Sequence, residues 1–384
     1  MNERLTHIAL LPWMVAGVRT QYENLRLLQP LDNVVVDTLP IIPYQEDGLI
    51  ERLPFLRSSQ KGTLRSMTQT LPLVSRPRYD AIWTQALLPL LPYVAATEAR
   101  HRAIPSIVYA IDTTPTLMDG FYEVYYGKPH ARGLKRGLRD LLHRYLLRRC
   151  AAVAPWSHWA ARSFIRDYGV PEERVHVILP GVDLIQWSPP PHRQPNAGAR
   201  NERTFRLLFV GADWERKGGP LLLDVFRQHL ASRCELHLVT KAAVEEGPSI
   251  RVYRGFGPNE PGLRQLYEEC DALVLPTRAD CFSLASIEAM ACGLPVITCP
   301  VGGIPEIVRH GETGFLISPD DGSTLLSAIE ALLDDPALCS RLGLTGRAVA
   351  ERKFDNSRNS ARLLSLVLRL SEMVMVNPDT KIKI

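Results

Sequence analysis

The segment from Asp280 to Val308, DCFSLASIEAMACGLPVITCPVGGIPEIV, determines the fold that this sequence predicts. Its pattern indicates, in order, a loop, a helix, a strand, a glycine turn and a second helix. Ser283 is expected to begin the first helix as an N-cap, because its hydroxyl can accept a hydrogen bond from an unsatisfied backbone N–H. Gly293 followed by Pro295 ends that helix. The apolar run 294–299 that follows is typical of a short strand.

The same segment combines a glycine turn with two carboxylates, Asp280 and Glu288, which stand eight positions apart. Gly302 and Gly303 open the turn after the strand. Strand ends, bare glycine backbone and helix N-termini bind anions readily, because their N–H groups point toward the ligand. We therefore expect a ligand that carries both phosphate groups and vicinal hydroxyls.

The segment resembles the E-x7-E signature of retaining nucleotide-sugar glycosyltransferases of family 4, with Asp280 in place of the first glutamate. The resemblance implies that Asp280 contacts hydroxyls of the donor sugar and that Glu288 holds the ribose of the nucleotide. It also implies that the backbone amides of Phe282, Ser283 and Leu284 contact the sugar and its diphosphate. The aspartate is one methylene group shorter than the family's glutamate. The alternative for Glu288 is a solvated glutamate on a helix surface.

A second loop, GADWERKGGPLLLDVF at 211–226, follows the strand-like run 205–210. In the family that the chain resembles, this loop supplies an arginine and a lysine that neutralise the donor diphosphate. Lys217 matches the lysine, whereas Ala212 stands where many relatives have the arginine. Either Arg216 substitutes for it or the second charge is missing. Fixed cations lower the barrier to departure of a nucleoside diphosphate. The alternative is that Arg216 and Lys217 are solvated loop charges.

Two positions in the N-terminal half are further candidate site residues. Asp112 follows the strand-like run 107–111, near the place where many family members have a histidine that contacts the donor sugar. Its carboxylate either binds a sugar hydroxyl, orients the acceptor, or belongs to a turn stabilised by Thr114. Gly17 follows the first strand, where relatives have a glycine-containing loop that lets phosphate and acceptor approach. A simple turn requires a glycine equally.

The composition is that of an ordinary globular enzyme. At 384 residues, with 46% hydrophobic and 22% charged residues, the chain is long enough for two domains. A net charge of +4 does not indicate a dedicated nucleic-acid-binding protein. The seven cysteines form no C-x-x-C pair, which favours reduced, buried thiols over disulfides or a zinc site. No apolar run approaches the ~18 residues of a membrane-spanning helix.

Strand-like and helical runs alternate along the chain, which predicts parallel sheets covered by helices. The predicted strands are 7–11, 34–39, 81–84, 107–111, 151–154, 205–210, 235–240, 250–253, 272–276 and 295–299. The fold class is therefore α/β, and the resemblance implies the GT-B fold, in which two doubly wound Rossmann-like domains face each other across a cleft. The predicted divisions are an acceptor-binding domain (1–187), a linker (188–204), a nucleotide-sugar-binding domain (205–358) and a helix and tail (359–384) that cross back to the first domain.

The segment 127–149, GKPHARGLKRGLRDLLHRYLLRR, carries eight Lys or Arg residues and one acid, Asp140. A helix over 133–149 would gather six apolar or aromatic side chains on one face. These are Leu134, Leu138, Leu141, Leu142, Tyr145 and Leu146. Either that face packs on the sheet with a solvated basic back, or the segment binds anionic lipid at ~1 kcal/mol per basic residue.

The sequence and the resemblance together predict a metal-independent, retaining hexosyltransferase whose only cofactor-like ligand is its nucleotide-sugar co-substrate. Asp112, Lys217 and Asp280 are its candidate catalytic residues. The expected acceptor is a glycan, a glycolipid or a small glycoside, as in polysaccharide or glycolipid biosynthesis, and no nucleic acid is involved. The expected location is the cytoplasm, with peripheral contact to the inner membrane face. Two alternatives stay open: another GT-B enzyme, such as a nucleotide-sugar epimerase or a phosphorylase, and a non-catalytic protein that binds sugar nucleotides.

Overall fold

The computed structural model of the chain describes residues 5–25, 33–45, 48–54, 58–75, 79–127, 134–193 and 204–376. They form two compact units. The first lies within residues 1–119, 130–178 and 358–384, and the second within 120–129 and 179–357. Most of the predicted linker, 194–203, and the predicted tail, 377–384, lie outside the described residues. The predicted domain boundaries stay predictions.

The first unit is built on a five-stranded parallel sheet in the order β2-β1-β3-β4-β5. Its strands are β1 Thr6–Leu11, β2 Val34–Thr38, β3 Ala81–Thr84, β4 Ser106–Ile111 and β5 Cys150–Pro155. Every residue of β3 and β4 is buried, which explains why these strands are continuous runs without polar alternation. The five strands predicted for this half are confirmed, and their ends differ from the predicted ones by at most one residue.

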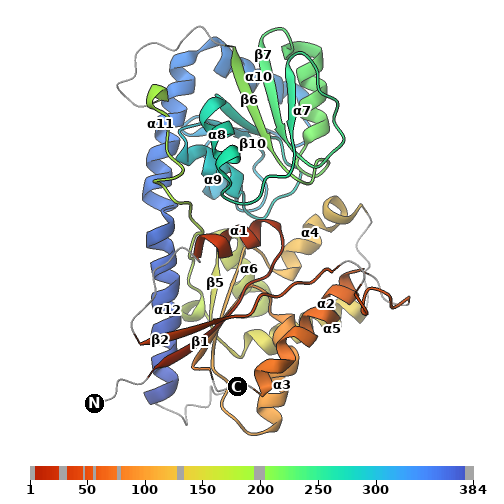
Figure 1. Cartoon of the computed structure of the whole chain (residues 1–384), viewed down its shortest axis with the longest axis vertical. Coiled ribbons are helices and arrows are strands. Elements are labelled where there is room, and N and C mark those ends of the chain that lie inside the picture. Colours follow the sequence, from red (N-terminus) through yellow and green to blue (C-terminus); the bar gives the residue numbers. More distant parts are fainter. Residues whose placement is uncertain are drawn as a thin grey trace. The chain divides into compact units, whose positions relative to one another are not determined.

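The C-terminal helix α12 (Asn356–Val376) packs on the first sheet from Arg358 onward (Figure 1). Leu366 and Val367 join Trp83 in one core cluster. The Ser106 hydroxyl donates a hydrogen bond to the Leu370 carbonyl at 2.6 Å. The other helices of this unit are α1 Ala16–Leu25, α2 Ser58–Thr70, α3 Leu91–Ala99, α5 Leu134–Leu147 and α6 His158–Tyr168. Helix α4 (Pro115–Tyr126) begins in the first unit and ends in the second.

The second unit is built on a six-stranded parallel sheet in the order β11-β10-β9-β6-β7-β8. Its strands are β6 Phe205–Val210, β7 Cys234–Val239, β8 Ile250–Tyr253, β9 Ala272–Leu275, β10 Val296–Thr298 and β11 Gly314–Leu316. Its helices are α7 Gly219–Val225, α8 Pro261–Glu269, α9 Leu284–Ala291, α10 Gly322–Asp334 and α11 Pro336–Lys353. The five predicted strands are confirmed to within one residue at each end. The edge strand β11 was not predicted.

The segment 280–308 begins as predicted, with a loop, a capped helix and a strand. Ser283 is the N-cap of α9, and its hydroxyl accepts a hydrogen bond from the Ser286 N–H at 3.3 Å. Gly293 follows the helix in the left-handed conformation, with φ +73°. The local signals for the start and the end of α9 are therefore sufficient to place it.

The second helix predicted within this segment is wrong. After Gly303 the chain makes a single 3₁₀ turn, Ile304–Glu306. Ile307 and Val308, which follow, are buried in the core. β-branched side chains lower helix propensity, so Ile307 and Val308 do not favour extending this turn into a helix.

The predicted apolar face of the basic helix α5 is wrong in two positions. Leu138 and Leu141 are 56% and 62% exposed, whereas His143, Leu146 and Leu147 are buried. Leu141 and Leu146 stand five residues apart, which is about 140° around a helix, so both cannot face the same sheet. The side chain of Leu134 lies outside the described part of the helix. Of the helices that the structure describes, none is both long enough and apolar enough to cross a bilayer.

Candidate functional site

Glu288 lies on α9 with only 7% of its surface exposed. Burial raises the pKa of its carboxyl group to about 7, and a hydrogen bond from Tyr267 opposes part of that rise. The Tyr267 hydroxyl of α8 donates this bond to Glu288 Oε2 at 2.9 Å. Tyr267 is packed in turn against Trp187, edge-on, with ring centroids 5.2 Å apart. Glu288 is therefore not a solvated helix glutamate, and its raised pKa is typical of a functional group.

The loops that follow β6 and β9 bring Lys217, Arg216 and Asp280 together. The ammonium group of Lys217 forms an ion pair with Asp280 Oδ2, and Arg216 Nη1 lies 3.9 Å from Asp280 Oδ1. Arg216 Nη1 also donates to the Ala279 carbonyl at 2.7 Å. The side chains of Arg216 and Lys217 are only 13% and 14% exposed. The alternative of two solvated loop charges is therefore wrong.

Arg216 is fixed by further contacts within the second unit. Its Nε donates to Asp213 Oδ2 at 2.9 Å. Its guanidinium lies over the ring of Tyr125, 4.3 Å from the centroid, in the part of α4 that belongs to this unit. Burial lowers the pKa of Arg216, but Tyr125, Asp280 and Asp213 raise it, so the net pKa is above its ordinary value. Arg216 is a permanent, preorganised cation beside Lys217.

Two glycines allow the loops of this cluster to approach each other. Gly302 has φ +57°, and a Cβ there would lie 2.0 Å from the Asp280 carbonyl oxygen. Gly218 has φ +77°, and its Cβ would lie 2.0 Å from the Pro276 carbonyl oxygen. Any side chain at either position would displace the loop that carries Asp280 or the loop that carries Lys217. The glycine turn recognised in the sequence thus serves to position the acid.

Phe282, Ser283 and Leu284 connect Asp280 to α9 and are all buried. The Ser283 hydroxyl also accepts a hydrogen bond from the Ser286 hydroxyl at 2.8 Å. Amide N–H groups at the start of a helix have no partner within the helix, so this turn presents donors next to Asp280. The structure therefore brings Arg216, Lys217, Asp280 and the start of α9 together, with Glu288 one turn further along.

Asp112 and Gly17 belong to the first unit. Asp112 is half-buried directly after β4. The Thr114 hydroxyl accepts a hydrogen bond from the Leu117 N–H at 3.3 Å and bonds the Ser163 hydroxyl at 2.6 Å. The predicted loop around Gly17 is instead the first turn of α1. The roles of Asp112 and Gly17 stay predictions.

Sequence reasoning missed three residues that hold the site, namely Asp213, Tyr125 and Tyr267. Asp213 precedes Arg216 by three positions, a spacing that places two side chains together in any helical turn. This spacing could have identified Asp213 as a partner of Arg216. The two tyrosines contact Arg216 and Glu288 from distant parts of the chain, and no sequence pattern links them to their partners.

Two family models match consecutive parts of the chain. The "Glycosyl transferase 4-like domain" matches residues 28–181, and "Glycosyl transferases group 1" matches residues 204–335. The first match covers most of the sheet of the first unit. The second covers the loops that carry Arg216, Lys217, Asp280 and Glu288.

Curated relatives match over about half of their length. D-inositol 3-phosphate glycosyltransferase 1 of Catenulispora acidiphila is 33% identical over 204 residues, which is 47% of this chain and 49% of the relative. The MMP alpha-(1->4)-mannosyltransferase of Mycolicibacterium hassiacum is 32% identical over 206 residues, which is 51% of this chain and 48% of the relative.

Solved structures match over nearly the whole chain at low identity. Sucrose-phosphate synthase from Thermosynechococcus elongatus aligns with a TM-score of 0.72 and 20% identity over 95% of this chain and 99% of its own. The HepE protein of Anabaena, crystallised with UDP and glucose, aligns with a TM-score of 0.65 and 17% identity over 94% of this chain and 98% of its own.

Two parallel Rossmann-like sheets, each in its own unit, together with these structural neighbours define a protein of the GT-B fold. The predicted fold class is confirmed. Because both family models match and the curated relatives agree with them, the chain belongs to the family 4 type of GT-B glycosyltransferases, glycosyl transferases group 1.

Proposed function

We propose that the protein is a retaining glycosyltransferase that moves a hexose from a nucleoside-diphosphate sugar to a hydroxyl acceptor. The observation that carries this proposal is the cluster of Arg216, Lys217 and Asp280 in front of α9, the helix that carries the buried Glu288. Both curated relatives described above carry glycosyltransferase names, and HepE was crystallised with UDP and glucose. These likenesses support a nucleotide-sugar donor.

Each group of the cluster suits one part of such a donor. The carboxylate of Glu288 accepts hydrogen bonds from the ribose diol through the oxygen that Tyr267 does not occupy. Lys217 and Arg216 face the diphosphate, and the N–H groups at the start of α9 add neutral donors. Asp280, released from part of its ion pair with Lys217, contacts the sugar hydroxyls. The site thus combines acceptors for hydroxyls with cations for phosphate.

In the proposed reaction, the bond between the anomeric carbon of the donor sugar and the diphosphate oxygen breaks. The acceptor oxygen forms its bond on the same face of the sugar, and its proton passes to the departing phosphate oxygen. Lys217 and Arg216 stabilise the negative charge that develops on the diphosphate. We propose that this transfer reaction needs neither a metal ion nor a cofactor. Turnover that survives excess EDTA, and an unchanged anomeric configuration in the product by NMR, would support both points.

The acceptor is proposed to be a glycan, a glycolipid or a small glycoside. Phe121, Tyr122, Tyr125 and Tyr126 form an aromatic surface on α4, with ring centroids of Tyr122 and Tyr126 4.6 Å apart and Tyr126 57% exposed. Tyr125 joins this surface to the donor loop through Arg216. Aromatic rings offer broad, rigid contact area to a sugar ring at low entropic cost. Asp112 is proposed to bind a sugar hydroxyl or to orient the acceptor.

The test of donor binding is the Glu288→Ala variant in titration calorimetry with nucleotide sugars. We expect binding to be lost, because the ribose diol loses its acceptor. Glu330→Ala, which removes a glutamate from α10, is the matched control and should bind normally. Undiminished affinity in Glu288→Ala refutes the ribose assignment. Thermal-shift screening against UDP, GDP, ADP and their sugars identifies the base, because a ligand that binds only the folded state raises its apparent stability.

Turnover separates the proposed enzyme from the alternatives. A glycosyltransferase releases a nucleoside diphosphate only when a hydroxyl acceptor is present. An epimerase changes the sugar without releasing it, and a phosphorylase consumes free phosphate. A non-catalytic binding protein shows donor affinity with no turnover on any acceptor of the panel.

Peripheral membrane contact through α5 is a second proposal, and the exposed Leu138 and Leu141 favour it. Several of the basic residues nearby are already paired, for example Arg139 with Asp119 at 2.8 Å. Apolar insertion of Leu138 and Leu141 would therefore add to the attraction between the basic helix and anionic lipid. We expect sedimentation with anionic but not neutral liposomes, release at high salt, and loss of binding in Leu138→Gln/Leu141→Gln. Ile165→Gln on α6, also at an exposed apolar position, is the control, and equal recovery from both liposome types ends the proposal.

A further inference from the structure

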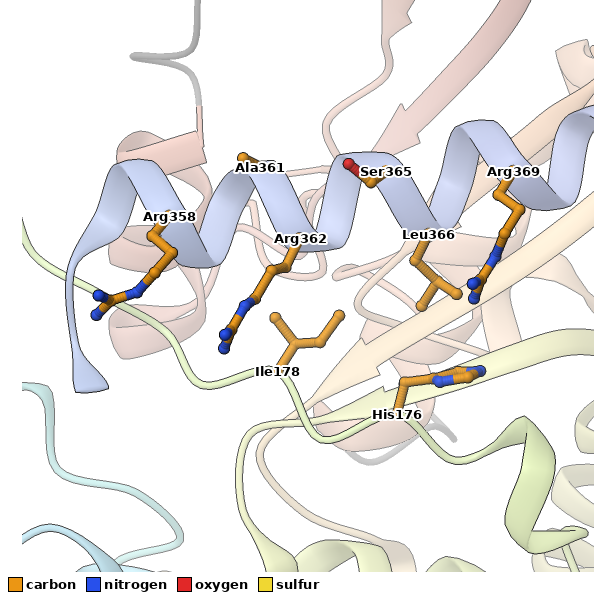
Figure 2. A pocket seen from close by; sticks show the side chains of 8 residues that line it. All are labelled: His176, Ile178, Arg358, Ala361, Arg362, Ser365, Leu366 and Arg369. Atoms are coloured by element: carbon orange, nitrogen blue, oxygen red, sulfur yellow. The ribbon is translucent and has the colours of Figure 1, made fainter. Parts of the chain in front are cut away.

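A groove of about 730 Å³ lies in the first unit, between α12 and the segment 176–178. Figure 2 shows the side chains of Arg358, Arg362 and Arg369 leaving α12 on the side of this groove, with Ile178 opposite. These residues lie outside the donor site, which belongs to the second unit. Nothing in the proposed reaction uses them.

The floor of the groove is apolar and firmly held. Leu366 is 5% exposed and belongs to a core cluster against which Ile178 also packs. The His176 N–H donates to the Val153 carbonyl at 2.9 Å, and the Ile178 N–H donates to the Pro155 carbonyl at 3.0 Å. The segment opposite α12 therefore runs along β5 as part of its sheet edge, and the groove is a preformed feature of the fold.

The charges that line the groove have one sign. Its lining includes three arginines and no acid. Arg362 and Arg369 are exposed, and neither forms a hydrogen bond or an ion pair with any residue that the structure describes. Elsewhere in this unit Arg139 and Arg149 are paired with acids at 2.8 Å and 2.6 Å. The guanidinium groups of Arg362 and Arg369 above an apolar floor are complementary to phosphate, which arginine binds through two parallel N–H groups.

We propose that this groove binds a small organic molecule with a phosphate group at each end. Arg362 and Arg369 are seven residues apart, or about 10 Å along the helix axis, so each guanidinium can meet one of two phosphate groups held at that separation. The carbon body of the ligand would lie over Leu366 and Ile178. The volume lies within the ~300–1,000 Å³ range of small-molecule sites. The site does not depend on the proposed glycosyltransferase activity.

The experiment is titration calorimetry of the full chain with a hexose bisphosphate and with inorganic phosphate, at low ionic strength to limit screening. The wild-type protein should bind the bisphosphate more tightly than inorganic phosphate. Arg362→Gln/Arg369→Gln should lose at least about tenfold in affinity for the bisphosphate. Arg162→Gln, at an exposed arginine on α6, is the matched control and should bind like the wild type. Thermal melting of each variant shows whether the fold is kept.

Lys217→Met separates this groove from the donor site. It should keep the bisphosphate affinity, while Arg362→Gln/Arg369→Gln should keep its affinity for the nucleotide sugar. Loss of bisphosphate binding in Lys217→Met assigns the ligand to the donor loops and overturns the proposal. The proposal is also overturned if the wild-type protein does not bind the bisphosphate, or if Arg362→Gln/Arg369→Gln binds it as tightly as the wild type. If the protein binds vesicles that contain phosphatidic acid but does not bind the soluble bisphosphate, the ligand of the groove is a lipid headgroup. That result also overturns the proposal of a small soluble ligand.

Discussion

Two pairs of cationic side chains in this molecule differ in their burial and in their ion pairing. Arg216 and Lys217, in the second unit, are mostly buried and paired with Asp213 and Asp280. Arg362 and Arg369, on α12, are exposed and have no partner among the described residues. Burying a charge costs solvation free energy, so the first pair requires acids in the folded state and is fixed in position. The second pair keeps its hydration and stays adaptable, as suits reversible capture of a ligand.

Removing one buried cation should have the largest effect and is the strongest test of this contrast. Lys217→Met should lower turnover by about 10²–10³-fold, because one preorganised donor to developing charge is lost. Arg362→Gln should leave turnover unchanged in the absence of any bisphosphate. Steady-state kinetics with saturating acceptor measures both. Equal activity of the two variants would show that the burial of Lys217 has no catalytic meaning.

Gly302→Ala tests the turn that positions Asp280. The added Cβ would meet the Asp280 carbonyl oxygen, and φ +57° strains any residue other than glycine. Gly311→Ala is the matched control, because Gly311 has φ +75° but no atom within 4 Å of a Cβ. We expect Gly311→Ala to lower the free energy of unfolding by about 1 kcal/mol through strain alone.

Gly302→Ala should destabilise by more than that and weaken nucleotide binding by at least about tenfold, since the loop must move. Urea denaturation and calorimetry on both variants separate strain from displacement. If the two variants behave alike, the close approach of Gly302 to Asp280 does not position the acid.

The parts of the fold that could be predicted from sequence are those that depend on neighbours along the chain. All strands of both sheets except β11 lie in mainly apolar runs, and α9 carries its own cap and stop signals, so these elements were placed correctly. The pair Asp280 and Glu288 lies within one short segment, and its spacing could be read directly. What could not be predicted is where Ile307 and Val308 bury, since that depends on the packing of the whole core.

The contacts that tune the site were also beyond sequence reasoning. Tyr267 reaches Glu288 from another helix, and Tyr125 reaches Arg216 from α4. The groove on α12 shows the same limit, because its apolar residues predicted only a helix, while the opposite wall at 176–178 is far away in sequence. Periodicity indicates that a helix has an apolar face, but not which distant segment covers it.

The raised pKa of Glu288 predicts a pH dependence that the exposed groove should not share. Burial raises this pKa to about 7, so the carboxyl is largely protonated at about pH 5.5. The ribose diol donates hydrogen bonds and therefore binds the ionised form. Affinity for a nucleotide sugar should rise with pH, by up to about tenfold per unit below the pKa, and level off above it.

Calorimetry from about pH 5.5 to about pH 8.5 measures this profile. A nucleotide sugar is the suitable probe, because its diphosphate carries no titrating group in that range. Glu288→Gln, which cannot ionise, should bind more weakly with a flat profile. A wild-type profile as flat as that of the variant would show that Glu288 is already ionised when the donor arrives.

Tyr267→Phe should have the smallest effect, and it separates the positioning of Glu288 from its burial. The hydrogen bond from Tyr267 lowers the pKa of Glu288, so its removal should move the midpoint of the affinity profile to higher pH. At pH about 7 the variant should bind a nucleotide sugar a few-fold more weakly, whereas well above the new midpoint it should approach wild-type affinity. A purely structural role of Tyr267 predicts instead the same loss at every pH. The phenylalanine should keep the edge-on contact with Trp187, so the packing of α8 is expected to be preserved and the shift of the midpoint reports the loss of the hydroxyl.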